Sequence, residues 1–168
     1  MNSAALGAFT LLAVLATKLA TLPDRAEFAI HPSDSDLALF PGEQATVTLY
    51  VEAAAALEVP HLELAPSAVD WQVEADGVVH YLEAGTCINS ASAWVYTTPS
   101  AISLVPGGAG RIRVTVKVPR NAEPGVYRTG VRIAHNRDAR TIGLSGDVLR
   151  LTVRIVPPVS LPRWQAAP

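Results

Sequence analysis

The sequence predicts an all-β protein folded as a sandwich of two antiparallel sheets. Short runs of alternating apolar and polar residues recur after Pro23, and Pro, Gly, Asn and Asp separate them. Alternation with a period of two is typical of strands with one buried face, whereas a helix needs a period near 3.6. About eight such runs in a chain of 168 residues match a single sandwich domain, which typically has about seven to nine strands.

Eight strands are expected, and residues with defined turn chemistry lie between several of them. Glycine follows proline or aspartate at Gly42, Gly77, Gly107 and Gly125, where the chain is expected to reverse direction. The expected strands cover residues 27–31, 45–52, 69–74, 78–83, 93–97, 111–118, 126–134 and 148–156. Their number and spacing favour an immunoglobulin-like arrangement.

Alternation in the last three runs assigns each side chain to a face. The expected core residues are Ile112, Val114, Val116, Val118, Tyr127, Thr129, Val131, Ile133, Leu149, Leu151, Val153 and Ile155. In an immunoglobulin-like order the last two strands are neighbours. Arg128, Arg132, Arg150 and Arg154 would then share one outer surface, which we predict as a partner-binding face.

The run 69–74 and Tyr127 support this arrangement. Trp71 is expected to face inward with Val69 and Val73, as a buried Trp does in many such sandwiches. The same strand should pair with 126–134, which would bring Asp70 and Glu74 near Arg128 and Arg132. Tyr127 follows a Pro-Gly turn and is a candidate tyrosine corner, with its hydroxyl bonded to nearby backbone.

The two ends of the chain differ from its middle. Residues 4–22 are apolar except for Lys18, and as a helix they would span about 28 Å, the thickness of a bilayer core. We expect residues 1–23 to be a membrane anchor, with a cleaved signal segment as the alternative, followed by a sandwich over 24–156. Residues 157–168 should form an extended, proline-rich tail in which Trp164 is a further candidate partner-binding residue.

Patterns that carry catalysis or bind cofactors are lacking. His31, His61, His80 and His135 are not at metal-ligand spacing, and no phosphate-binding loop or nucleophile elbow occurs. Asp34 and Asp36, shortly after His31, are weak candidates for a metal site, and a polar turn over residues 31–36 is favoured instead. The single cysteine, Cys87, is expected to be an inert buried thiol. We therefore predict no enzyme, no cofactor, no resident metal and no small-molecule substrate.

Charge is unevenly distributed along the chain. Residues 1–110 hold twelve acidic residues against two basic ones, and residues 111–168 hold eleven basic residues against three acidic ones. Nucleic acid is not the expected partner, because the basic strands lack interleaved exposed aromatics and the isoelectric point is about 6.1. An acidic protein partner or anionic lipid headgroups would suit a basic face.

Three phrases carry a family resemblance that covers roughly residues 27–156. They are "FAIHPSDSDLALFPGEQATVTLYV" from Phe28, "TTPSAISLVPGGAGRIRVTV" from Thr97 and "VPRNAEPGVYRTGVRI" from Val118. Together they resemble the N-terminal, PapD-like immunoglobulin-like domain of periplasmic pilus chaperones, of which this chain would be a single-domain relative. The resemblance implies a periplasmic sandwich that binds protein subunits. It places Asp34 near the family's first basic anchor and Arg154 near the second.

Three functions follow as hypotheses. The first is a non-enzymatic accessory subunit, anchored in the inner membrane, whose periplasmic sandwich docks onto a larger membrane protein assembly. The second is a pilus-type chaperone that binds partners by strand addition at 148–156. The third is a secreted carbohydrate- or surface-binding module, for which Tyr50 and Tyr81 are the best exposed aromatic candidates.

Overall fold

The structure is a sandwich of two β-sheets. It is a computed structural model that describes residues 27–135 and 147–157, so the expected anchor at 4–22 and Trp164 lie outside the described residues. The strands are β1 (Phe28–His31), β2 (Asp34–Leu39), β3 (Gln44–Ala53), β4 (Leu62–Val73), β5 (Val79–Glu83), β6 (Val95–Thr98), β7 (Ile102–Leu104), β8 (Ala109–Lys117), β9 (Gly125–His135) and β10 (Val148–Ile155). A short 3-10 turn, Ser92–Trp94, precedes β6.

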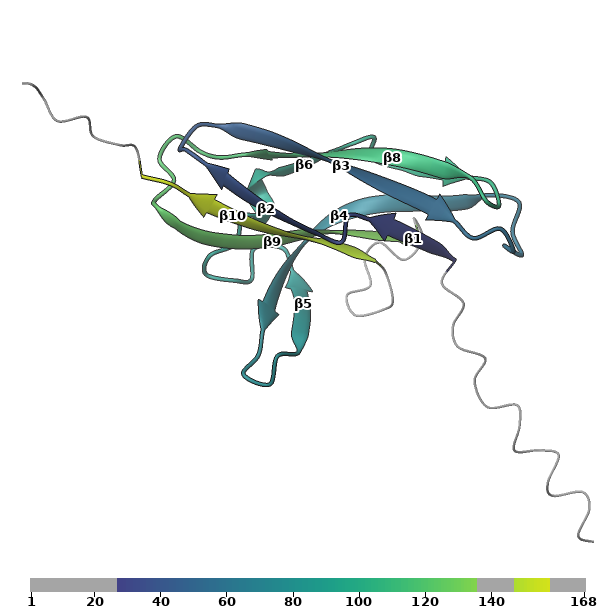
Figure 1. Cartoon of the computed structure of the whole chain (residues 1–168), viewed down its shortest axis with the longest axis horizontal. Helices are drawn as coiled ribbons and strands as arrows, with labels where there is room; N and C mark the ends of the chain where they lie inside the picture. Colours follow the sequence, from purple (N-terminus) through teal and green to yellow (C-terminus); the bar gives the residue numbers. More distant parts are fainter. Residues whose placement is uncertain (1–26, 136–146, 158–168) are drawn as a thin grey trace, which may run out of the picture.

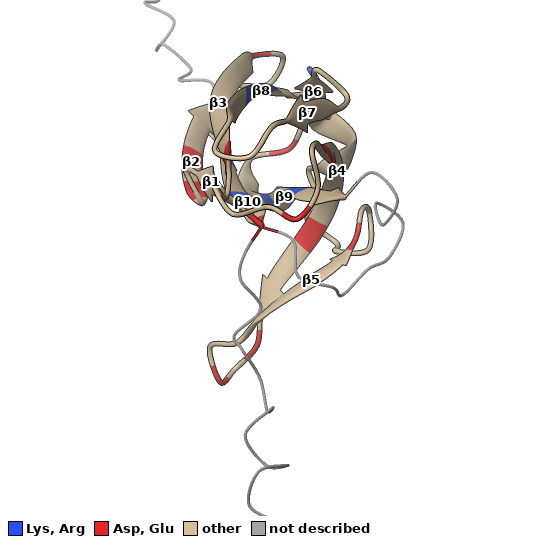
Figure 2. Ribbon diagram, turned by 90° about the vertical axis from the view of Figure 1, so that its right-hand side faces the viewer, with Lys and Arg blue, Asp and Glu red and all other residues tan. Residues whose placement is uncertain are grey.

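The strands form two layers, which Figures 1 and 2 show from two sides. The four-stranded sheet has the order β1-β3-β8-β6. The six-stranded sheet has the order β2-β10-β9-β4-β5, and β7 pairs with the other end of β4. All neighbours are antiparallel except β2 and β10, which are parallel. The expected immunoglobulin-like sandwich is therefore present, and its last two strands are neighbours as predicted.

The chain passes from the four-stranded to the six-stranded sheet at two prolines, each preceded by a cis peptide bond. One follows His31, between β1 and β2, and the other follows Thr98, between β6 and β7. The polar turn expected over 31–36 is therefore wrong in part, because Asp34 begins a strand. The acidic run forms a strand because β10 supplies a hydrogen-bonding neighbour over the whole length of β2.

The core lies between the two sheets and follows the predicted alternation. Eleven of the twelve expected core residues are buried, and Tyr127 is partly buried against the same cluster. Tyr127 also confirms the tyrosine corner, since its hydroxyl donates to the Glu123 carbonyl over 3.0 Å and its ring packs on Trp94 with centroids 4.6 Å apart. This contact ties the turn before β9 to the strand that follows it.

β4 departs most from expectation. It begins seven residues earlier than predicted. Leu62 and Leu64 face the core, and every second residue after them as far as Asp70 lies on the same side of the strand. This parity buries Asp70 completely and turns Trp71 to the outer face, so the expected inward Trp is wrong. The inversion is possible because Asp70 is fully hydrogen-bonded, whereas an unsatisfied buried carboxylate would be expensive.

The last part of β4 and all of β5 leave the body of the sandwich as a hairpin. We call residues 69–83 the hairpin arm, and it projects from the six-stranded sheet in Figures 1 and 2. Asp76 and Gly77 form its tip, where the Gly77 N–H donates to Glu74 and Gly77 has a φ of 85° that favours glycine. Within the described ranges, no helix is long and apolar enough to cross a bilayer.

Candidate docking surfaces

The four predicted arginines occupy the outer face of the six-stranded sheet, but their surroundings differ. β9 and β10 pair so that Thr152 lies opposite Arg128, Gly130 opposite Arg150, and Val148 opposite Arg132. Arg128 and Arg154 are exposed, whereas Arg132 is only 6% exposed and Arg150 is half-buried. The register of the predicted basic face is therefore right, but only two of its four arginines are openly exposed.

Arg150 is held by Asp34 of β2. The two residues lie directly opposite in the parallel register, and the guanidinium contacts both carboxylate oxygens, at 2.6 Å from Nε and 2.8 Å from the terminal nitrogen. This hydrogen bond is the main reason that the pKa of Asp34 is lowered and that of Arg150 raised. Asp34 is therefore an acidic partner within the chain, where the chaperone resemblance would place a basic anchor.

Trp71 forms the centre of this outer face. The Arg128 guanidinium lies over its ring at 5.2 Å from the centroid, and the Arg150 guanidinium at 6.0 Å. Its indole N–H donates to the Thr129 carbonyl over 2.7 Å. Each guanidinium is attracted by the negative charge of the π system of the ring. We call Trp71, Arg128 and Arg150 the tryptophan platform.

Gly130 lets the strands beneath the platform approach closely. A Cβ at this position would lie 2.9 Å from the Val148 side chain, 3.1 Å from the Leu149 carbonyl oxygen and 3.2 Å from the Val69 side chain. Any larger residue would force β9 away from these neighbours. The glycine within the predicted basic strand is therefore a packing requirement.

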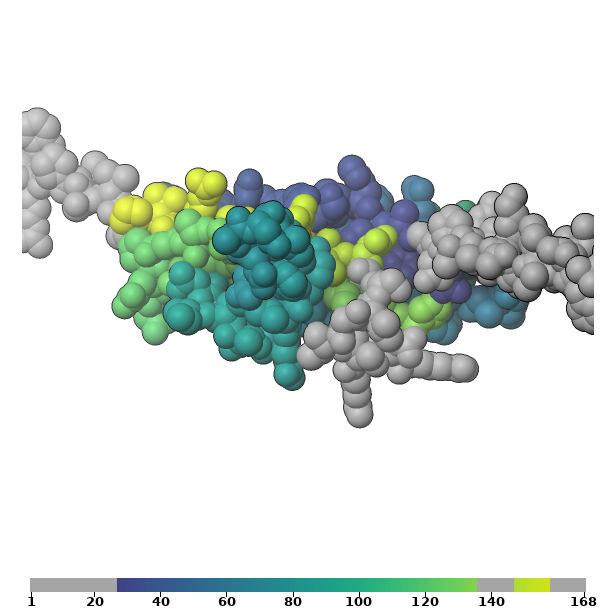
Figure 3. Space-filling view, turned by 90° about the horizontal axis from the view of Figure 1, so that it is seen from below, coloured from purple at the N-terminus to yellow at the C-terminus, as the bar shows by residue number. Residues whose placement is uncertain are grey.

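The hairpin arm exposes apolar side chains next to the platform. Val73, Val78 and Tyr81 are each exposed by between 38% and 48%, and Tyr81 lies opposite Trp71 in the β4–β5 register. Ile88, in the loop that follows the arm, is fully exposed. Viewed from below, the teal arm stands beside the green of β9 and the yellow of β10 (Figure 3). Exposed apolar residues gathered in this way are typical of protein interaction sites.

Asp70 fastens the loop that carries Ile88. Its carboxylate accepts hydrogen bonds from the Ser90 hydroxyl at 2.6 Å and the Cys87 backbone N–H at 2.8 Å. The Ser90 hydroxyl also lies 2.7 Å from that of Ser92. The Arg128 N–H donates to the Asn89 carbonyl and the Ala91 N–H donates to the Arg128 carbonyl, which completes the attachment of the loop to β9. The Asp-Ser cluster thus holds a loop in place.

Cys87 lies in this loop and has the character of an inert thiol. Partial burial raises the pKa of Cys87, and the Asp70 carboxylate raises it further against a smaller opposite effect of Arg128. A raised pKa keeps the sulfur protonated near neutral pH, where only the thiolate is a strong nucleophile. This agrees with the expectation from the sequence, although the thiol is only partly buried.

Two histidines lie beside glutamates. His80 lies 3.4 Å from Glu74 across the arm, and His135 contacts Glu27. In the part of the chain that the structure describes, no three His, Cys, Asp or Glu residues form a group that could hold a metal ion. His31, Asp34 and Asp36 therefore do not assemble the metal site that their spacing left open.

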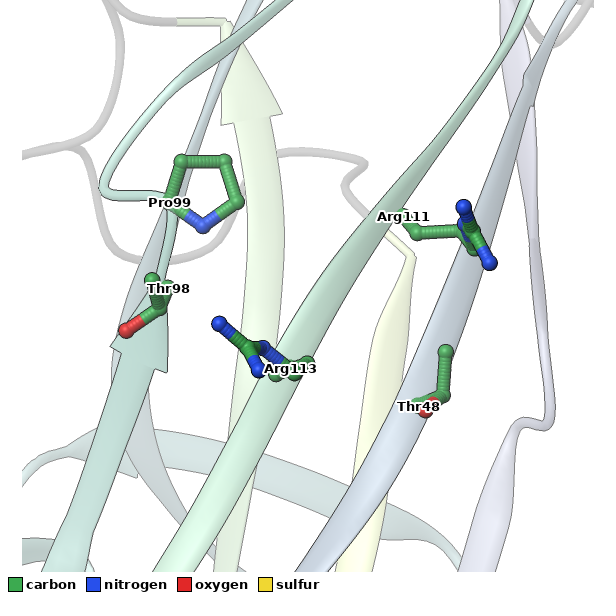
Figure 4. Close-up of a pocket in the computed structure, with 5 residues that line it drawn as sticks. All are labelled: Thr48, Thr98, Pro99, Arg111 and Arg113. Atoms are coloured by element: carbon green, nitrogen blue, oxygen red, sulfur yellow. The ribbon is translucent and has the colours of Figure 1, made fainter.

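A second basic face lies on the opposite side of the sandwich. Arg111 and Arg113 project from β8 on the outer face of the four-stranded sheet, beside Thr48 of β3 and Thr98 of β6. With Pro99 they line a shallow groove of about 370 Å³ (Figure 4). The sequence pattern places Arg111 and Arg113 outside, but it gives no sign of the groove, because Thr48 and Pro99 come from distant segments.

β10 does not offer the free edge that the strand-addition hypothesis assigned to it. It pairs with β9 from Val148 to Ile155 and with β2 from Arg150 to Ile155. Its alternate apolar residues Leu149, Leu151 and Val153 are completely buried in the core. Strand addition at 148–156 is therefore excluded by the fold, and β5 is instead a terminal strand of this sheet.

Comparisons with known proteins concern the fold. No family model matches the chain, and no curated protein matches it in sequence. A family 123 glycoside hydrolase from Clostridium perfringens is similar in structure, with a TM-score of 0.50, 9% identity, and coverage of 73% of this chain and 23% of that one. The chain thus spans about a quarter of the hydrolase, and the likeness shows the β-sandwich alone.

Two further solved structures are similar at lower scores. PapD-like domain 7 of human CEP192 has a TM-score of 0.48 and 14% identity, with coverage of 81% of this chain and 89% of that one. The periplasmic chaperone SfaE has a TM-score of 0.44 and 13% identity, with coverage of 78% and 61%.

The sequence-based prediction missed Trp71, Tyr81 and Asp34 as members of the arginine-rich face. Alternation over 69–74 predicts that Trp71 faces the core with Val69 and Val73, and this agrees with the buried tryptophan of many such sandwiches. A signal was present in the strand itself, because Leu62 and Leu64 share the parity of Asp70. Asp34 had no such local signal, since its partner Arg150 is 116 residues away.

Proposed function

We propose that this protein is a non-enzymatic interaction subunit whose sandwich docks onto a protein of a larger membrane assembly. The proposal includes an anchor at residues 4–22 and an extracytoplasmic position for the sandwich. Its main support is the hairpin arm, where Val73, Val78 and Tyr81 are exposed next to the tryptophan platform and the fully exposed Ile88. Apolar and aromatic residues rimmed by charges are the usual composition of a protein interface.

The arm and the platform would act together. Tyr81 lies opposite Trp71 in the register, so the apolar side of the arm adjoins the exposed Arg128. A partner that covers the arm would therefore also meet a positive charge. We expect that partner to present apolar side chains with an acidic rim.

The test is recovery of a defined partner from detergent-solubilised membranes by the full chain. The arm variant Val73→Ser/Val78→Ser should lose that partner, because apolar contacts at the centre of an interface carry most of the binding energy. The matched control is Val105→Ser/Val126→Ser, since these two valines are similarly exposed outside the arm. Equal recovery by both variants would contradict docking through the arm. A freely soluble mature protein that begins at Thr17 would contradict the anchor.

Strand addition at β5 is the second candidate. β5 is the terminal strand beside β4, so an extended segment of a partner has an available sheet edge there. In that case, changes to the backbone of β5 should lower the affinity for the partner more than replacement of Val73 and Val78 does. Backbone amide exchange over residues 79–83 would slow in the complex if a strand is added, and would stay unchanged if only side chains dock.

A further inference from the structure

The groove on the four-stranded sheet is a built polar site on the face away from the tryptophan platform. Its floor comes from three adjacent strands: Thr48 on β3, Arg113 on β8 and Thr98 on β6 lie in one row of the register. In Figure 4 the side chain of Arg113 points toward Thr98 and Pro99, while that of Arg111 extends over β3. The two arginines, the two threonines and Pro99 line one shallow hollow of about 370 Å³.

The two arginines of this groove form no ion pair within the described part of the chain. Arg111 and Arg113 are exposed, and neither forms an ion pair with a carboxylate of residues 27–135 or 147–157. Arg150, on the other sheet, is paired with Asp34 through two of its three guanidinium nitrogens. Arg111 and Arg113 are two positions apart on one strand, so their Cα atoms are about 7 Å apart. The groove therefore offers two neighbouring sites for anionic groups.

Two exposed tyrosines stand at opposite ends of the same face. Tyr50 lies opposite Arg111 and is 47% exposed, while Tyr96 lies opposite Thr115 and is 58% exposed. From the strand rise and spacing, their Cα atoms are separated diagonally by about 17 Å, with Arg113 between them. Tyr81, which is the other aromatic candidate from the sequence, belongs to the other sheet. Of the two tyrosines considered for a carbohydrate-binding face, Tyr50 therefore shares its sheet face with Tyr96 and not with Tyr81.

We propose that this face binds an anionic glycan, in which sugar rings lie on Tyr50 and Tyr96 and ring carboxylates are bound by Arg111 and Arg113. A planar guanidinium binds a carboxylate through two parallel hydrogen bonds, and the Thr48 and Thr98 hydroxyls can bond sugar hydroxyls between them. The rings of tyrosine supply flat apolar surfaces with a polar edge.

The site favours a glycan over an acidic peptide. Extended peptides usually bind through a sheet edge or through pockets for apolar side chains. This groove lies across a sheet face, and its lining consists of two arginines, two threonines and one proline. A peptide would find charge here but no apolar pocket, whereas a charged sugar would meet groups for its rings, hydroxyls and carboxylates.

The experiment measures binding of three probes to the full chain in detergent micelles by titration calorimetry. The probes are oligogalacturonate, the same oligosaccharide with its carboxylates methyl-esterified, and polyglutamate of similar charge. We expect oligogalacturonate to bind, the neutral ester to bind at least about tenfold more weakly, and polyglutamate to bind more weakly than oligogalacturonate.

Variants separate the specific site from general attraction by a basic surface. Arg111→Gln/Arg113→Gln should lower oligogalacturonate affinity by about tenfold or more, and Tyr50→Ala and Tyr96→Ala should each lower it by about two- to tenfold. Tyr81→Ala and Arg154→Gln are the matched controls on the other sheet and should leave it unchanged. Lack of oligogalacturonate binding, or equal effects of the variants and their controls, would overturn the proposal. Equal affinity for polyglutamate with no effect of Tyr50→Ala or Tyr96→Ala would assign the groove to an acidic protein instead.

Discussion

The two outer faces of the sandwich carry arginines at alternate strand positions, yet they differ in what surrounds those arginines. On the six-stranded sheet, Arg150 is paired with Asp34 and stacked with Arg128 on Trp71. On the four-stranded sheet, Arg111 and Arg113 stand beside threonines and tyrosines and have no ion-pair partner among the described residues. The same sequence pattern thus places arginines against an acidic and an aromatic side chain in one sheet and beside threonines and tyrosines in the other.

The difference originates in which strands border the arginines. After His31 the chain leaves the four-stranded sheet, and β2 then places Asp34 alongside β10. β4 carries Trp71 outward because Asp70 occupies the inward position. The neighbours of β8 are β3 and β6, whose outward residues opposite Arg113 are both threonine. Pairing partners, more than the arginines themselves, decide whether a basic strip is structural or available for binding.

The largest expected effect comes from filling the close approach beneath the platform. Gly130→Val should destabilise the fold by about 3 kcal/mol, because its side chain would overlap Val148, Val69 and the Leu149 carbonyl. Arg113→Val, at the centre of the other outer face, should change the stability by less than about 0.5 kcal/mol. Urea unfolding of both variants measures this difference. Similar stability of the two variants would mean that the two outer faces tolerate substitution equally well.

Removal of the Asp70 carboxylate should have the next largest effect. Asp70→Ala leaves the Ser90 hydroxyl and the Cys87 N–H without their acceptor, which should lower the free energy of unfolding by about 2 kcal/mol. Cys87 should also react faster with a thiol reagent, because its loop is released from Asp70 of β4 and a charge that raises its pKa is lost. The control is Asp36→Ala on the exposed side of β2. If thiol reactivity is unchanged, Asp70 does not hold the loop.

Truncation of the platform should cost somewhat less. Trp71→Ala removes the hydrogen bond to the Thr129 carbonyl and the ring under Arg128, so we expect a loss of about 1–2 kcal/mol. Tyr96→Ala on the other face should be close to neutral, since that ring is mainly exposed. Thermal unfolding followed by circular dichroism compares the two. A more destabilising Tyr96→Ala would reverse the assignment of structural and accessible faces.

The smallest effect concerns the Asp34–Arg150 pair and depends on pH. Arg150→Gln should destabilise the fold by about 0.2–1 kcal/mol at neutral pH, because the pair is solvent-exposed. The pKa of Asp34 is lowered in the folded state, so this contribution is complete above the unfolded value near 3.9 and is lost as the pH falls through the lowered folded value. The free energy of unfolding of the wild type and of Arg150→Gln, measured at pH 7 and below pH 4, should differ less at the lower pH. Arg154→Gln should show no such change.

Local periodicity predicted much of the fold. Alternation placed ten core residues of β8, β9 and β10 and the adjoining Val118 correctly, and the Pro-Gly turn with Tyr127 predicted the tyrosine corner. The predictions failed where a residue's partner lies far along the chain. β2 looked like a polar turn because its strand character comes from β10, and the early part of β4 contains a proline that weakens the strand signal.

The sequence by itself determined that the chain forms a sandwich, which residues fill its core and which strands carry arginines outward. These properties follow from side-chain alternation, which is local. Only the tertiary structure decided which arginines are paired, that Trp71 lies outside, and that Tyr50 shares a face with Tyr96. These depend on strand order and register, because neighbours such as Asp34 and Arg150 are brought together across 116 residues by hydrogen bonds between strands.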